Sequence, residues 1–131
     1  MTKEYGVQTA MHLDWQCAIR SMADIERLLT LTSPDVGLAI DTGDLTLAGV
    51  DPIALYEKHI DRVKHFHFKD TQGERGFCEM GAGKVKFPAL LKSIKQHNYS
   101  GWIIVEMEGG SSAQTNCMLN SWYVKKVLST V

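Results

Sequence analysis

The sequence has few cysteines, and their spacing does not build a site. Cys17, Cys78 and Cys117 are odd in number and widely separated, and no Cys-x-x-Cys pair occurs. Such a set argues against a disulfide framework and against a structural zinc knuckle. We therefore interpret the three as reduced thiols, some buried as small apolar side chains, and assign no catalytic thiol.

The chain also lacks an excess of one charge and a long apolar run. Fourteen basic and fifteen acidic side chains leave a formal net charge of -1. This balance gives no electrostatic reason to expect nucleic acid or an acidic membrane as a partner. No run approaches the ~18 apolar residues that cross a bilayer. Residues 1–5 show no segment of signal-peptide type, so the expected location is the cytoplasm.

What is present is a pattern of short apolar runs that end in ionisable side chains. The 131 residues are 44% hydrophobic, enough for the core of one domain spanning residues 1–131. Four runs have β-type composition and are bounded by turn signals. They are residues 6–14, 36–44, 63–70 and 102–106, and they carry His12, Asp41, His67 and Glu106 toward their ends. In parallel α/β folds sites are built at that end of the strands, so the pattern predicts a metal or sugar site.

Four segments of helical periodicity alternate with these runs. They are residues 21–29, 51–60, 87–95 and 117–128. Asp51 followed by Pro52 is a strong helix start. For the last helix the spacing predicts a packing face of Leu119, Trp122, Tyr123, Val127 and Leu128. The fold class is therefore α/β, with four consecutive βα units, a parallel sheet and right-handed crossovers.

Four βα units are half the number in a closed (β/α)8 barrel, which typically takes ~250 residues. A half-barrel leaves two parallel strand edges and an apolar inner face in water, which favours aggregation. We therefore predict a homodimer or higher oligomer that completes the barrel. A small open sheet that covers itself is the alternative.

Several motifs, in a fixed order, resemble the xylose isomerase-like TIM-barrel superfamily of sugar isomerases and epimerases. They are Asp41-Thr-Gly-Asp44, Ala48-Gly49-x-Asp51-Pro52, Arg62-Val-x-His65-x-His67-x-Lys69-Asp70, Gly81-x-Gly83-x-Val85-x-Phe87-Pro88 and Tyr99-x-Gly101-Trp102-x-x-Val105-Glu106. The likeness is closest to the inosose dehydratases and covers nearly the whole chain. It implies that the four units correspond to strands five to eight of the barrel, the half that carries the metal ligands.

The resemblance implies a divalent metal held by Asp41, His67 and Glu106, with His12 as a fourth ligand. Mn, Co, Mg or Zn suits such a set of carboxylates and imidazoles. Two positions depart from the family pattern. His12 stands where the family usually has Glu, and Asp44 replaces the histidine of the family's Asp-Thr-Gly-His.

The implied activity is that of a sugar isomerase or epimerase, or of an inosose dehydratase-like lyase, on a small keto-sugar or polyol. A metal-polarised carbonyl acidifies the neighbouring C–H, and Glu106 would act as ligand and acid/base. Lys69 and Asp70 would orient substrate hydroxyls or carry protons at the rim of the site, and Asp44 would take the place of a substrate-contacting histidine. A two-base epimerase needs a second carboxylate opposite Glu106, which Asp14 or Asp44 would supply.

Each candidate also has a purely structural interpretation. Asp41 could cap a turn, His12 could be a satisfied core histidine, and Glu106 could pair with Lys69 or Arg62. The chain could likewise be a catalytically inactive half-barrel fragment or a small-molecule binding module. Metal-dependent DNA-repair endonucleases fit less well, because they need a basic surface. The glycine-rich segment 70–83 is expected to be a loop that shapes substrate access.

Overall fold

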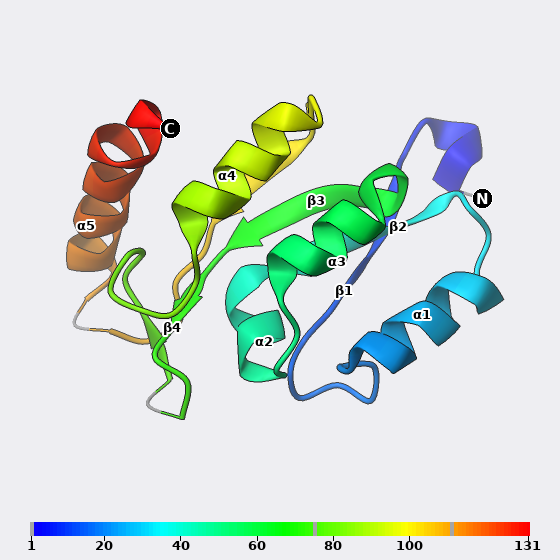
Figure 1. The fold of residues 1–131 in the computed structure, drawn as a ribbon, viewed down its shortest axis with the longest axis horizontal. Coiled ribbons are helices and arrows are strands. Elements are labelled where there is room, and N and C mark those ends of the chain that lie inside the picture. The colour runs from blue at the N-terminus through cyan, green and yellow to red at the C-terminus, as the bar shows by residue number, and fades with distance from the viewer. Residues whose placement is uncertain (1, 75, 111) are drawn as a thin grey trace.

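Four parallel strands form the sheet at the centre of the molecule. The computed structural model describes residues 2–74, 76–110 and 112–131. The strands are β1 (Thr9–His12), β2 (Val36–Asp41), β3 (Val63–Phe68) and β6 (Trp102–Val105), hydrogen-bonded in the order β1-β2-β3-β6. Every neighbouring pair is parallel. The predicted α/β fold with four consecutive βα units is therefore confirmed (Figure 1).

The helices cover one face of this sheet (Figure 1). They are α1 (Met22–Leu31), α3 (Pro52–Lys58), α4 (Phe87–Gln96) and α5 (Ala113–Lys126), with short 3-10 turns at Thr2–Tyr5, Ile60–Arg62 and Leu128–Thr130. Ser21 and Asp24 form a capping box at the start of α1. The side chain of Asp51 accepts a hydrogen bond from the backbone N–H of Ile53 at the start of α3, as its sequence predicted. No helix of the described residues is long and apolar enough to span a membrane.

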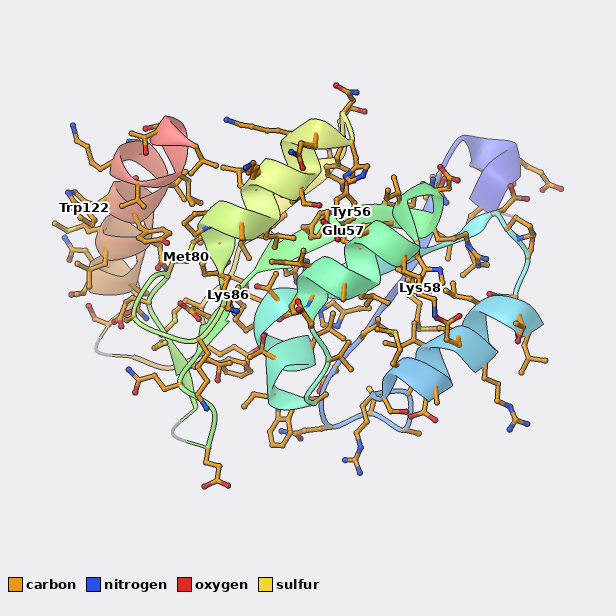
Figure 2. All side chains as sticks on the ribbon, in the orientation of Figure 1. Tyr56, Glu57, Lys58, Met80, Lys86 and Trp122 are labelled. Carbon is orange, nitrogen blue, oxygen red and sulfur yellow. The ribbon has the colours of Figure 1, made fainter. Side chains whose placement is uncertain are left out.

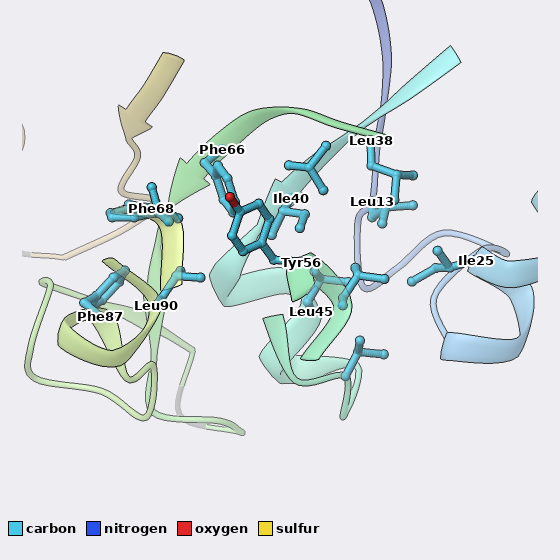
Figure 3. Packing of buried hydrophobic residues seen from close by; sticks show 14 of the residues in the cluster. Leu13, Ile25, Leu38, Ile40, Leu45, Tyr56, Phe66, Phe68, Phe87 and Leu90 are labelled. Atoms are coloured by element: carbon cyan, nitrogen blue, oxygen red, sulfur yellow. The ribbon is translucent and has the colours of Figure 1, made fainter. Parts of the chain in front are cut away.

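The core lies between the sheet and the helices (Figure 3). Ile40 of β2 and Phe66 of β3 are fully buried there, and the Phe66 ring lies 5.3 Å from the ring of Tyr56 on α3. Because side chains alternate along a strand, burial of these residues sends Asp41 and His67 to the opposite face. Core packing thus determines which face carries the ionisable residues.

That opposite face is open, and so are the two edges of the sheet. Most residues of β1 and β6 are exposed. Trp102 is 76% exposed and Ile104 is 41% exposed. Apolar side chains on a free parallel edge are what the predicted half-barrel would leave uncovered.

Two elements were not predicted from the sequence. A short helix, α2 (Thr42–Leu47), follows β2 directly, because the Asp41 side chain caps it by accepting the backbone N–H of Asp44 at 2.9 Å. A two-stranded hairpin of β4 (Asp70–Thr71) and β5 (Phe77–Cys78) lies within the segment expected to be a loop.

The predicted packing face of the last helix was partly wrong. Leu119 and Trp122 are 46% and 59% exposed, and Trp122 points away from the other helices (Figure 2). Of the predicted face, Tyr123 packs with its ring centroid 6.1 Å from that of Phe87, and Leu128 is buried. Asn116 and Asn120 of the helix are also buried. Asn120 accepts a hydrogen bond from the backbone N–H of Met80 at 2.8 Å. The three cysteines are free, as expected, and Cys78 is buried.

Candidate metal centre

The carboxyl ends of the four strands bring His12, Asp41, His67 and Glu106 together. One ligand-type atom of each lies within 4.8 Å of those of the other three. His12 and Asp41 are the last residues of β1 and β2, and Glu106 directly follows β6. The parallel register pairs Asp41 with His67. All four residues suggested as metal ligands therefore meet at one edge of the sheet.

One carboxylate oxygen of Asp41, Oδ2, lies at the middle of this group. This oxygen is 3.7 Å from Nε2 of His12 and 3.8 Å from Nδ1 of His67. His67 Nδ1 is also 2.5 Å from Oε2 of Glu106. The four side chains therefore converge on one point rather than forming separate pairs.

Two of these atoms are buried and make no well-aligned hydrogen bond within the described part of the chain. They are Asp41 Oδ2 and His67 Nδ1, and the imidazole nitrogen has only the nearby carboxylate oxygens of Asp41 and Glu106 beside it. Burying a polar atom without a partner is costly, and a cation between the two would remove that cost. Two imidazoles and two carboxylates are a donor set suited to a divalent metal such as Zn, Mn or Co. The residues present therefore fit such an ion.

Capping and ligation use different oxygens of Asp41. Oδ1 caps α2, whereas Oδ2 points into the group. The structural interpretation of Asp41 is therefore correct for one oxygen, and it leaves the other oxygen available.

Behind the group lies Lys69, whose side chain is 2% exposed. Its Nζ is 2.8 Å from Oε1 of Glu108 and 3.0 Å from Oδ2 of Asp44. It is also 3.0 Å from Oε1 of Glu106 and 3.3 Å from Oδ2 of Asp41. The expected ion pair between Glu106 and Lys69 is thus present, in addition to the convergence on His67.

Three further expectations do not hold in this arrangement. Arg62 donates to the backbone carbonyl of Val36 rather than pairing with Glu106. Asp14 lies outside the group and accepts the backbone N–H of Gln16 at 2.7 Å. Asp70 is fully buried and does not reach a substrate at the rim. Glu108 was not singled out from the sequence, although its spacing of two residues from Glu106 was a signal.

Burial and neighbouring charges separate the pKa values of these carboxyl groups. Burial alone would raise the pKa of Asp41, but His12, the Asp44 N–H and Lys69 outweigh it, and the pKa lies below its usual range. Burial also raises the pKa of Glu106, and Lys69 reverses that effect to a net lowering. Asp44 has less compensation, so burial and the adjacent Asp41 raise its pKa to about 6. Asp41 and Glu106 are therefore ionised at neutral pH, as metal ligands must be.

Lys69 stays charged in spite of its burial. Desolvation lowers the pKa of a buried lysine, but here Glu108, Asp41, Glu106 and Asp44 raise the Lys69 pKa above its ordinary value. His65 lies two residues before His67 on the same face of β3, and the centroids of the two rings are 5.0 Å apart. Burial, with the charges of His67 and His12, lowers the pKa of His65.

Comparison with known proteins agrees with the resemblance seen in the motifs. The profile of the xylose isomerase-like TIM-barrel family matches residues 1–121. An inosose dehydratase from Lacticaseibacillus casei is 34% identical over 125 aligned residues, covering 81% of this chain and 42% of that protein. The rhizopine catabolism protein MocC from Rhizobium meliloti is 32% identical over 123 residues, covering 80% of this chain and 38% of that protein. The chain thus spans about two fifths of the length of these relatives.

This chain also matches only part of each similar solved structure. The probable 3-DHS dehydratase AsbF from Bacillus anthracis superposes with a TM-score of 0.79 at 13% identity, over 95% of this chain and 52% of that chain. The IOLI protein with a bound zinc atom superposes with a TM-score of 0.78 at 20% identity, over 98% of this chain and 51% of that chain. At such identities the likeness establishes the fold, which is about half of each neighbour. From its motifs, its four-stranded parallel sheet and these matches, the chain belongs to the xylose isomerase-like TIM-barrel family and is close to the inosose dehydratases.

Proposed function

We propose that this chain carries the metal-binding half of an enzyme that dehydrates a small keto-polyol of the inosose type. The observation that supports it most directly is the convergence of His12, Asp41, His67 and Glu106 within 4.8 Å. The similarity to inosose dehydratases supports this substrate class. Epimerisation of a keto-sugar is the related reaction that the same centre could perform.

In this proposal the four residues hold one divalent ion. Bound there, such an ion supplies Lewis acidity to the carbonyl oxygen of the substrate. Glu106 is ionised and has one oxygen beside His67, so it is the base that removes a proton from the carbon next to the carbonyl. The proton taken up by Glu106 passes to the hydroxyl on the following carbon, which leaves as water, and the electron pair of the broken C–H bond forms a carbon–carbon double bond conjugated with the carbonyl.

The two other catalytic candidates, Lys69 and Asp44, contact each other, and Lys69 also contacts Glu106. Asp44 is 3% exposed and contacts Lys69, so it acts on the charge of the site rather than on a substrate hydroxyl. Its raised pKa of about 6 makes it the carboxyl of the site closest to taking up a proton near neutrality.

The test is an assay of keto-inositol dehydration by protein loaded with Mn, Co, Mg or Zn. We expect turnover that the Glu106→Gln variant reduces by at least about a hundredfold, because it removes the base. The exposed Glu4 provides the matched control, and Glu4→Gln should keep the parent rate. A parent protein that binds metal but turns over no keto-sugar would support the binding-module alternative instead.

We also propose that a second copy of the chain covers the open face. β1 and β6 each present a free parallel edge, and two copies joined edge to edge would supply the eight strands of a closed barrel. A groove of about 420 Å³ beside β6 and α5 continues the uncovered surface, with Val105, Met107 and Val124 among its lining residues. Such a surface in water is the expected signature of a missing partner.

Sedimentation velocity tests this proposal. The parent should run at twice its 14.6 kDa mass. Trp102→Glu places a charge on the open face of β6 and should give monomers, whereas Met118→Glu on the exposed side of α5 should not. A monodisperse parent monomer would contradict the proposal.

A further inference from the structure

We propose that Lys69 is a positioning residue, a fixed internal cation that holds Glu106 with one oxygen directed at the metal position. In the same proposal, the Thr42-Gly43 pair is the clamp that holds Lys69. This inference rests on the proposed metal site, and it assigns a role to residues that would not touch the ion themselves.

The clamp begins with the backbone of Lys69. The Thr42 hydroxyl donates to the carbonyl oxygen of Lys69 at 2.6 Å and accepts the N–H of Lys69 at 2.9 Å. Both polar backbone groups of Lys69 are thus paired with one side chain. This explains why a threonine follows Asp41 at a fully buried position.

The clamp continues with the space that Gly43 leaves. A Cβ atom at Gly43 would lie 3.0 Å from Cγ of Lys69 and 3.1 Å from its carbonyl oxygen. A side chain at this position would therefore press on the lysine stem, which would have to shift by a few tenths of an ångström. The glycine of Asp-Thr-Gly leaves room for Lys69 to pass and does not serve an unusual backbone angle.

The ammonium group is shared unequally among four carboxylates. It has three N–H donors, and its three shortest contacts are with Glu108, Asp44 and Glu106 at 2.8 to 3.0 Å. Asp41 Oδ2 is farther away, at 3.3 Å, and keeps no hydrogen bond within the described residues. Glu106 therefore has Oε1 bound to Lys69 and Oε2 next to His67. The oxygens left to face the metal position are Oε2 of Glu106 and Oδ2 of Asp41.

An aromatic ring also contacts the Lys69 ammonium group. The Phe77 ring lies 4.5 Å from its Nζ and covers another side of the ammonium group. Without the lysine charge, the buried Asp41 and Asp44 would face Glu106 with no cation between them, and like charges at this distance repel. Partners that hold metal ligands in place commonly change metal affinity by about 10- to 100-fold when removed.

The experiment is a titration of the metal-stripped full chain with Co²⁺, which gives both an affinity and a visible absorption spectrum of the bound ion. Lys69→Met should weaken Co²⁺ binding about tenfold or more and change the spectrum, because Glu106 loses its orientation. Lys84→Met is the matched control, since Lys84 is exposed and outside the carboxylate group. Its affinity and spectrum should equal those of the parent.

A second variant leaves every charge in place. Gly43→Ala pushes the lysine stem and should change affinity and spectrum in the same direction as Lys69→Met, by a smaller amount. This variant decides the matter if Lys69→Met does not fold. If the parent binds no Co²⁺, the proposed metal site itself is wrong. If the parent binds and the folded variants match its affinity and spectrum, only the role of Lys69 is overturned.

Discussion

Asp41→Asn should lower the affinity for Mn²⁺ by more than about a hundredfold, beyond the loss typical for residues that merely support a ligand. The reason is the position of Oδ2 at the centre of the group, near both His12 and His67. Asparagine keeps an oxygen that can cap α2 but removes the negative charge that a divalent ion needs. Calorimetric titration of metal-stripped protein measures the affinity, and circular dichroism shows whether the variant is folded.

The chain offers a close control for this substitution. Asp51 also caps a helix, accepting the N–H of Ile53 at 2.9 Å, but it lies outside the group of candidate ligands. Asp51→Asn should therefore keep a comparable capping oxygen, lose the same negative charge and bind Mn²⁺ with the affinity of the parent. If Asp41→Asn binds Mn²⁺ as tightly as Asp51→Asn does, then Asp41 is only the cap of α2.

Asp70→Asn should lower the free energy of unfolding by about 3 kcal/mol or more. The Asp70 carboxylate is fully buried and accepts four backbone N–H groups, those of Thr71, Gly81, Gly83 and Val85, at 2.8, 2.9, 3.0 and 3.1 Å. Hydrogen bonds to a charged group contribute about 1.5–3 kcal/mol each. Asparagine has one acceptor oxygen, so its NH₂ group would face backbone donors. Urea denaturation at neutral pH measures the difference.

Asp61→Asn is the comparison for this variant, because Asp61 is exposed. Its unfolding free energy should stay within about 0.5 kcal/mol of the parent. A loss below about 1 kcal/mol in Asp70→Asn would show that segment 70–85 is held by other contacts. Gly83 is part of the same arrangement, since a Cβ there would lie 2.2 Å from Oδ1 of Asp70.

The sheet and the candidate ligand set could be predicted because they follow from local patterns. Parallel strands place their last residues at one edge, so His12, Asp41 and Glu106 had to come close once the strands were identified. The start of α3 was equally clear from Asp51 and Pro52. Whether the four residues bind a metal stays a prediction.

What could not be predicted depended on contacts between distant segments. The sequence of α2 reads as a turn, because Thr42 and Gly43 are poor helix formers, and only the Asp41 cap starts the helix. Asp70 looked like a rim residue, but its partners are backbone amides 11 to 15 residues later in the chain, apart from that of Thr71. Apolar periodicity placed the packing face of α5 only in part, because Tyr123 packs on Phe87 but the buried residues of the helix are two asparagines.

The two oxygens of Asp41 couple the formation of α2 to the arrangement of the candidate metal ligands. Oδ1 starts the helix while Oδ2 points to the place where an ion would be held, so one rotamer serves both. Fraying of the first turn would swing the central oxygen out of the group. By thermodynamic linkage, an ion that favours this rotamer also favours the helix, and a change that strengthens the helix start prepares the site for the ion.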